Sequence, residues 1–222
     1  AIAAVDQETA AYETLEETKN QAKVDINAEA DRLLNMINNS ETMPTVTKQA
    51  LISQIETLRD QAIADVEAVT DPTQASTIPP IVAQFRNDLK PLEDEIGPWN
   101  RLDSQRKAAR DKINADADQL INEIRNNTYL SESQKSDLIS QIETARSSAI
   151  TLVNSVIDPD TGEGTINTIL ANFENQIASI RAQAKAWADA NGAGGDGGGI
   201  PGDGDSYASD ITAKTGELSI FA

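Results

Sequence analysis

Apolar residues recur along most of the chain at the three- and four-residue spacing of an amphipathic helix. Residues 3–39 contain neither Gly nor Pro and are rich in good helix formers, so we expect one long helix there. The part before Ala22 is less apolar and is expected to project as an extension. The apolar series in this helix consists of Ile26, Ala30, Leu33 and Ile37.

A second apolar series predicts a helix over residues 47–69, and its stripe is wide enough to pack against two neighbouring helices. Within it, the heptapeptide LISQIET at 51–57 recurs at 138–144. At an offset of 87, residues 23–69 and 110–156 are identical at 22 of 47 positions, which is too many for chance. A fixed period of this length is typical of stacked supersecondary units.

A third helix follows in each copy. Pro79-Pro80 suits the first turn of a helix, because the amide hydrogen that Pro lacks is unpaired there anyway. Apolar residues after it reappear in the second copy at an offset of 88, so three amphipathic helices per copy predict an all-α fold. The matched residues are Ile78, Ile81, Phe85, Leu89 and Leu92, and then Ile166, Ile169, Phe173, Ile177 and Ile180.

We therefore expect two tandem three-helix bundles in an elongated array, followed by a Gly-rich linker and a short C-terminal β segment. Pro91 is expected to kink the third helix, and Gly97-Pro98 to break it. Ser131 to Gln134 fits a capping box at the start of a helix. The predicted segments are a helical extension (1–21), two three-helix repeats (22–97 and 98–190), a Gly/Asp-rich linker (191–205) and a β tail (206–222).

An aromatic residue stands at the same phase of each repeat, since Tyr12 falls on Trp99 and Trp99 falls on Trp187. We favour packing at a bundle end, and an exposed anchor for a partner is the alternative. No Gly or Pro occurs from 168 to 190, so the last helix is expected to continue past Trp187.

The composition changes after Ala190. Gly and Asp dominate up to Gly204, which favours a flexible linker. The tail then alternates apolar and polar residues around Thr215-Gly216, as a strand does. Because an isolated hairpin is marginal in water, we expect this tail to pair with a sheet edge on a neighbouring subunit. The candidate assembly residues in the tail are Ile211, Leu218, Ile220 and Phe221.

The chain carries a formal net charge of -18, which disfavours nucleic acid and anionic lipid as partners. It contains no Cys and no His, so thiolate chemistry and the commonest general base are excluded. No run of residues is long and apolar enough to insert into a membrane. Because the chain begins with Ala, a processed N-terminus is left open.

Metal and catalytic sites are weakly indicated. Asp158 and Asp160 resemble the start of a calcium loop, but the Gly and Glu that such a loop needs are out of position. We therefore favour a polar turn there, and a solvated linker at Asp203 and Asp205. Ser and Glu share a helix face in both heptapeptides, but no third group orients them, so we expect no enzyme. These pairs are Ser53 with Glu56 and Ser140 with Glu143.

Four short motifs of the second copy are Ile113-Asn114, Asn126-Asn127-Thr128-Tyr129-Leu130-Ser131, Gln134-Lys135 and Ile142-Glu143-Thr144-Ala145. These motifs resemble those of three-helix repeats in large Gram-positive surface proteins, the FIVAR-like modules. The resemblance covers at most residues 22–186, and it implies a spacer or adhesive stalk outside the cell. Helical repeats that lead into a Gly-rich linker and a β tip are also similar to virion fibre components.

The expected function is that of a non-enzymatic structural protein of an extracellular or virion fibre. Its helical repeats would act as a spacer, and its C-terminal tail would dock onto its own copies or onto another structural protein. We expect a homo-oligomer or part of a larger assembly, at the cell surface, in a virion or otherwise outside the cell. The alternative is a bacterial adhesin or stalk module that binds a host or matrix ligand.

Overall fold

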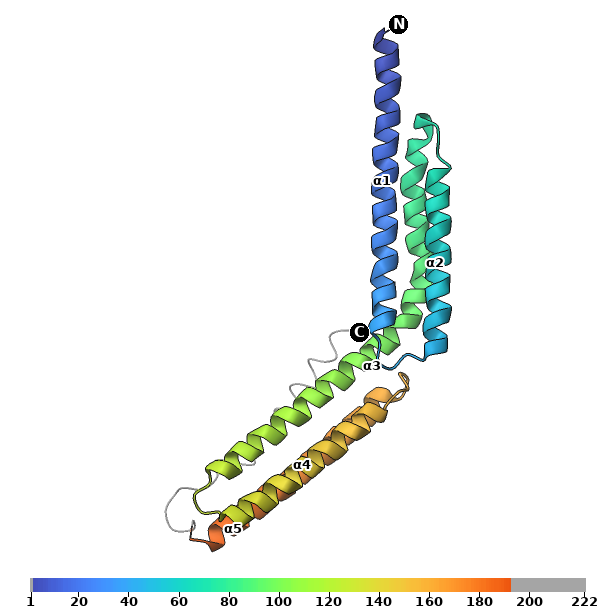
Figure 1. The fold of residues 1–222 in the computed structure, drawn as a ribbon. Helices are drawn as coiled ribbons and strands as arrows, with labels where there is room; N and C mark the ends of the chain where they lie inside the picture. Colours follow the sequence, from blue (N-terminus) through green and yellow to red (C-terminus); the bar gives the residue numbers. More distant parts are fainter. Residues whose placement is uncertain (1, 193–222) are drawn as a thin grey trace. The chain divides into compact units, whose positions relative to one another are not determined.

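A computed structural model describes residues 2–192, and these residues are almost entirely helical (Figure 1). The elements are α1 (Ile2–Asn39), α2 (Thr45–Glu67), η1 (Pro72–Thr77), α3 (Ile78–Asn126), α4 (Glu132–Ser155) and α5 (Gly162–Ala190). The predicted all-α class is confirmed for this part of the chain. The predicted β tail and nearly all of the predicted linker lie outside the described residues.

The contacts divide the chain into two compact units, which are described separately. Unit 1 comprises Ala1–Arg110 and Thr151–Ile169, and unit 2 comprises Asp111–Ile150 and Leu170–Ala222. Helices α3, α4 and α5 therefore each contribute residues to both units.

Unit 1 contains a three-helix bundle of α1, α2 and the first part of α3, which lie side by side in Figure 1. The predicted apolar series all face one shared core, with Leu58 and Ile81 partly buried at its edge. The core is aliphatic apart from Phe85, which is almost fully buried. The fully buried large side chains of this core are Leu15, Ile26, Leu33, Ile37, Leu51, Ile55, Ile78 and Ile96.

Unit 2 is built from the end of α3, most of α4 and most of α5. Its buried residues are those of the second copy of the apolar series, so equivalent positions of the two sequence copies are buried in the structure. Ion pairs at the edge of this core join α3 to both other helices: Asp118 to Arg146, Glu174 to Lys112 and Glu123 to Arg181. The buried residues include Ile113, Leu120, Ile124, Leu138, Ile142, Phe173, Ile177 and Ile180.

The predicted start of α4 is confirmed. The Ser131 hydroxyl accepts a hydrogen bond from the Gln134 backbone N–H at 3.3 Å, and the Gln134 side chain accepts one from the Ser131 N–H at 2.9 Å. These are the two reciprocal bonds of a capping box, which satisfy amides that a helix start leaves unpaired. The uninterrupted helix predicted through Trp187 is also confirmed, since α5 ends at Ala190.

The helix break predicted at Gly97-Pro98 is wrong, because α3 continues through both Pro91 and Pro98. The two prolines leave the carbonyls of Asn87 and Asp94 without their helical partners, and both of those residues are exposed, so water can bond to them. Gly97 also helps, because a residue before Pro clashes in the helical conformation partly through its Cβ, and Gly has none.

Two glycines near the start of α5 provide a test of the packing in unit 1. An added Cβ at Gly164 meets no atom within 4 Å, so Gly164→Ala is expected to stabilise the protein by about 0.5–1 kcal/mol. An added Cβ at Gly162 would lie 2.5 Å from Cδ1 of the buried Leu102, and such overpacking costs about 1–3 kcal/mol. Urea unfolding should therefore rank Gly164→Ala above the parent and Gly162→Ala below Gly164→Ala. Equal free energies of unfolding for the two variants would contradict this packing.

Candidate functional site

The buried polar side chains mark the best candidate for a functional site. Among the described residues, only four polar or charged residues are buried. Two lie within α1 and α3 and contact the ends of other helices, and two lie in the turn between α1 and α2. Burying such groups is costly unless they are hydrogen-bonded, so their partners indicate what the fold requires of them. These residues are Lys19, Ser40, Thr42 and Arg106.

Lys19 of α1 binds the C-terminal end of α2. Its ammonium group lies 3.4 Å from the backbone carbonyl oxygen of Glu67 and 3.3 Å from the Glu67 carboxylate. Glu16, one turn earlier on α1, lies at 3.3 Å from the same nitrogen, and Lys23 binds the Glu67 carboxylate at 2.7 Å. A cation is favourable at this position, because the last carbonyls of a helix are unpaired and carry partial negative charge.

The charges of this group are matched. Burial by itself lowers the pKa of Lys19, but the hydrogen bonds and charges of Glu67 and Glu16 outweigh it, so the pKa is raised. Hydrogen bonds from Lys23 and then Lys19 lower the pKa of the Glu67 carboxyl. Both groups are therefore charged at neutral pH, as an ion pair at a helix end requires.

Arg106 of α3 binds the C-terminal end of α4, as Lys19 binds the C-terminal end of α2. Its guanidinium donates to the carbonyl oxygens of Val153 at 3.2 Å and Asn154 at 3.0 Å. Arg110, one turn later, donates to the Asn154 side-chain oxygen at 3.0 Å. We call this arrangement of a buried cation on the first helix and the C-terminus of the second helix a helix-end cap.

The two helix-end caps are related by the sequence repeat. At the offset of 87, Lys19 falls on Arg106, Lys23 on Arg110 and Glu67 on Asn154. None of these pairs is an identity, so counting identical residues does not reveal them. The signal that would have found them is charge, since a cation stands at both positions of both copies.

A second set of contacts fixes the turn between α1 and α2. The Ser40 hydroxyl donates to Asp103 of α3 at 2.5 Å, and the Glu41 backbone N–H donates to the same carboxylate oxygen at 3.1 Å. Arg110 reaches the Glu41 carboxylate at 3.2 Å. Lys48 donates to the Ser40 carbonyl at 2.5 Å, so the turn is held from both sides. We call the contact of this turn with Asp103 a turn clasp.

Unit 2 contains a corresponding turn clasp. The Asn191 side-chain amide donates to the Tyr129 carbonyl at 2.7 Å and to the Gln134 side-chain oxygen at 3.0 Å. Tyr129 lies in the turn between α3 and α4, which is the repeat equivalent of the turn at Ser40. At the offset of 88, Asn191 falls on Asp103. Both clasping residues come four positions after a Trp.

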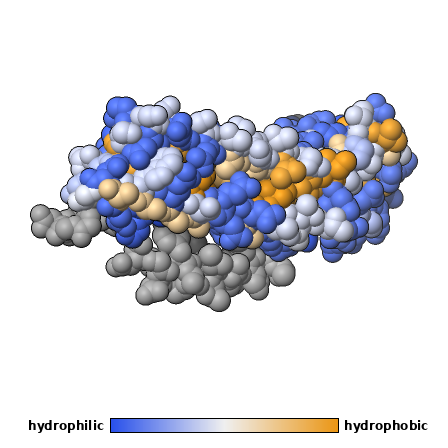
Figure 2. Space-filling view, turned by 90° about the horizontal axis from the view of Figure 1, so that it is seen from below, coloured by the Kyte–Doolittle hydropathy of each residue, from blue (hydrophilic) through white to orange (hydrophobic). Residues whose placement is uncertain are grey.

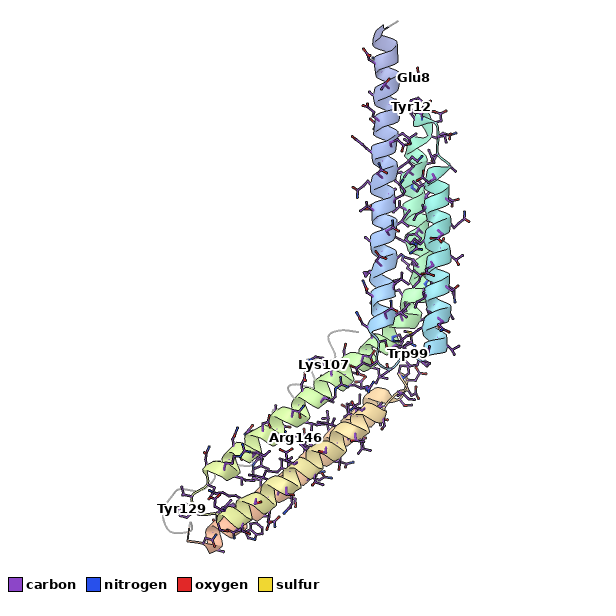
Figure 3. The ribbon with its side chains drawn as sticks, in the orientation of Figure 1. Glu8, Tyr12, Trp99, Lys107, Tyr129 and Arg146 are labelled. Atoms are coloured by element: carbon purple, nitrogen blue, oxygen red, sulfur yellow. The ribbon has the colours of Figure 1, made fainter. Side chains whose placement is uncertain are left out.

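The three aromatic side chains at equivalent repeat positions differ in how far they are buried. Trp99 packs against the core of unit 1, Trp187 is half-buried in unit 2, and Tyr12 is 47% exposed on α1. Figure 3 shows Tyr12 and Trp99 at separate places along the helices, so these two do not form one cluster. The tail candidates Ile211, Leu218, Ile220 and Phe221 lie outside the described residues.

Asp158, one of the candidate calcium positions, forms a polar turn before α5. Asp158 accepts hydrogen bonds from the Asp160 backbone N–H at 3.0 Å and the Thr161 hydroxyl at 2.8 Å, just before α5. The first of these bonds contributes most to lowering the pKa of Asp158. Asp203 and Asp205 lie outside the described residues. Within 2–192, no group of three or more His, Cys, Asp or Glu side chains is arranged to hold a metal ion.

The remaining surface is mainly polar. The face in Figure 2 is largely hydrophilic, with apolar residues in limited patches. Ser53 and Ser140, the candidate hydroxyls of the two heptapeptides, are both exposed. Ser140 lines an open groove in unit 2, together with Gln141, Thr144, Ala145, Ser148, Gln176, Ser179 and Ile180. In the described part of the chain, no helix is apolar over a sufficient length to span a bilayer.

Replacing Arg106 with Ala tests the helix-end cap. It removes two charge-assisted hydrogen bonds, one of them buried, together with the packing of a buried side chain, so we expect a loss of about 2–4 kcal/mol in the free energy of unfolding. Arg101→Ala, which removes an exposed cation from the same helix, is the matched control and should cost less than about 0.5 kcal/mol. Similar urea midpoints for the two variants would show that the cap contributes little.

The acid dependence of stability tests the carboxylates. Folding lowers the pKa of Glu67, Asp71 and Asp158, so their contribution to the free energy of unfolding is present above their ordinary pKa values. It should be lost as the pH falls below about 4.5, the ordinary value for Glu67. Glu67→Gln should flatten the decline between pH 6 and about pH 3, where these carboxyls take up protons. Glu17→Gln, which removes the same charge from an exposed position, is the matched control. Parallel curves for both variants would contradict this assignment.

Comparison with known families adds one finding. Residues 105–185 match the family model described as a domain of unknown function, DUF1542, and they span the end of α3, α4 and most of α5. This domain is found in Gram-positive surface proteins, as are the repeats that the sequence motifs resemble. The matched region covers just over a third of the chain. The chain has no significant match among curated proteins or among solved structures. The second repeat is thus similar to a module of bacterial surface proteins.

Proposed function

We propose that this chain is a non-enzymatic structural module of an extracellular assembly, in which the helical repeats act as a spacer. The C-terminal segment 206–222 would dock onto a neighbouring subunit, as its strand-like alternation suggests. The similarity to DUF1542 favours the surface of a Gram-positive cell over a virion fibre as the setting.

This proposal rests mainly on the hydrogen-bond partners of the buried polar side chains. A binding or catalytic site usually points its buried polar groups into a pocket. Here Lys19, Arg106 and Ser40 bind helix ends and a turn, and Thr42 lies in the same turn. Three of the four buried polar groups thus connect separate helices or a turn to a helix, and the Thr42 hydroxyl is buried without a hydrogen-bond partner. This use of buried polar groups favours a protein whose main requirement is a stable fold.

The open groove in unit 2 favours an adhesin as the second candidate function. Its walls carry hydroxyl and amide groups from α4 and α5, among them Ser140, Thr144 and Gln176. Such groups can hydrogen-bond a polar ligand such as a glycan or an extended peptide. The groove is open and holds no charged residue, so we rank this function below the spacer.

Surface display separates the two functions. The chain is displayed on a Gram-positive cell with a peptide tag at its N-terminus, and antibody access to the tag through the surface polymer layer is measured. Deleting residues 11–97 removes one period and keeps the helical register, since Ala11 and Pro98 are equivalent positions. A spacer predicts reduced access after the deletion, and restored access when an unrelated helical bundle of similar length is inserted.

Cell adhesion is measured in the same strains. An adhesin predicts saturable binding to host matrix that Thr144→Ala weakens and that the unrelated bundle does not restore. Unchanged tag access in the deletion strain would count against the spacer. The same result together with Thr144-dependent adhesion would favour the second candidate.

A further inference from the structure

The N-terminal part of α1 repeats the pattern of α3 where α3 passes from the first copy to the second. At the offset of 87, Ile2 and Val5 fall on Leu89 and Leu92, apolar residues of the first copy's third helix. Further along, Leu15 falls on Leu102, and both are buried. The first turns of α1 thus have the sequence of the end of a third helix.

The clasping position also occurs a third time. Asp103 follows Trp99 by four residues and binds the turn at Ser40. Asn191 follows Trp187 by four residues and binds the turn at Tyr129. Glu16 follows Tyr12 by the same spacing, and at the offset of 87 it falls on Asp103.

In the described structure, no turn is clasped at Glu16. Its carboxylate forms an ion pair with Lys19, and the Glu16 side chain is 60% exposed. Residues 6–14 of α1 are all exposed as well, including Tyr12, whose counterpart Trp99 packs against a core. The equivalent residues Asp103 and Asn191 each bind a turn, whereas Glu16 at the third equivalent position binds none in the described structure.

The cations beside Glu16 indicate what the missing turn carries. Arg106 and Arg110, next to Asp103, lie near the acidic side chain of Glu41 in the clasped turn, at 3.9 Å and 3.2 Å. Their repeat equivalents are Lys19 and Lys23. Lys19 and Lys23 also bind the Glu67 carboxylate, so an acidic residue in a docked turn would share these two cations with Glu67.

Within residues 2–192, neither of the two turns that join a first helix to a second helix is available to fill that position. The turn at Ser40 is held by Asp103, and the turn at Tyr129 is held by Asn191. The second turn also has Thr128 where the first has Glu41, so it lacks the acid that the cations would bind. The matching occupant is the turn of a further three-helix repeat.

We propose that Tyr12, Glu16, Lys19 and Lys23 form a docking surface for a further three-helix repeat, whose third helix continues into α1. The docked element is the turn between that repeat's first and second helices, with a Ser-Glu pair like Ser40-Glu41. The helical sequence match at Ile2 and Val5 favours a repeat in the same polypeptide over a second copy of the chain. This inference rests on the proposed spacer function and defines how spacer modules join.

A fused protein tests the docking surface. Residues 1–97 replace residues 1–10 at the front of the chain, so that Gly97 is followed by Ala11, the equivalent of Pro98. In the following repeat, Glu16→Ala should lower the equilibrium constant for folding about tenfold, because it removes hydrogen bonds to the docked turn. In the parent chain, the same substitution should change this constant less than about twofold. Glu17→Ala, an exposed acid on the same helix, is the control in both proteins.

A double-mutant cycle identifies the partner. Ser40→Ala in the front repeat and Glu16→Ala in the following repeat should show coupling, as Ser40→Ala and Asp103→Ala should in the parent chain. Amide exchange of residues 10–23 should also slow in the fused protein. Equal effects of Glu16→Ala in fused and parent chains, or no coupling to the front Ser40, would overturn the proposal.

Two further outcomes are distinguishable. Self-association of the parent chain that Glu16→Ala abolishes would make a second copy the occupant and would overturn the single-polypeptide version. If coupling is present but tag access on cells does not follow the number of repeats, the docking surface stands and the spacer function fails. If tag access follows repeat number without coupling, the spacer stands and this docking surface does not.

Discussion

The hydrogen bonds from a buried cation to the last carbonyls of a helix are the constraint on which the rest of this fold depends. A bundle of three helices can slide along its apolar seam, because leucines and isoleucines at regular spacing fit in several registers. Lys19 and Arg106 remove that freedom, since each reaches the end of one particular helix. An error of one turn would leave a charge buried without a partner, which costs several kcal/mol.

The sequence predicts the helices and their buried faces well because those features are local and periodic. The series at Ile26 and Leu33 and the capping box at Ser131 each depend on residues fewer than about ten positions apart. The break at Gly97-Pro98 was predicted from residue type alone. It fails because the carbonyls that the prolines leave unpaired belong to exposed residues, which a single sequence does not reveal.

The helix-end caps and turn clasps could not be predicted in the same way. Arg106 and Val153 are 47 positions apart, and Ser40 and Asp103 are 63 apart, so no local pattern connects them. The repeat held part of the information. Comparing charge between copies, in place of identity, pairs Lys19 with Arg106, and extending the aromatic spacing by four residues pairs Glu16 with Asp103 and Asn191. The tail candidates fall outside the described residues and stay predictions.

The continuity of α3 through both copies has a consequence for how such a chain could change over generations. The identical heptapeptides at 51–57 and 138–144 are natural places for unequal genetic recombination, which would insert or remove one period of 87 residues. Each such event would leave the shared helix in register and would give every new repeat its own cation and clasping residue. The number of repeats could then vary in a population while each repeat kept its fold, so that length would be a heritable trait separable from stability.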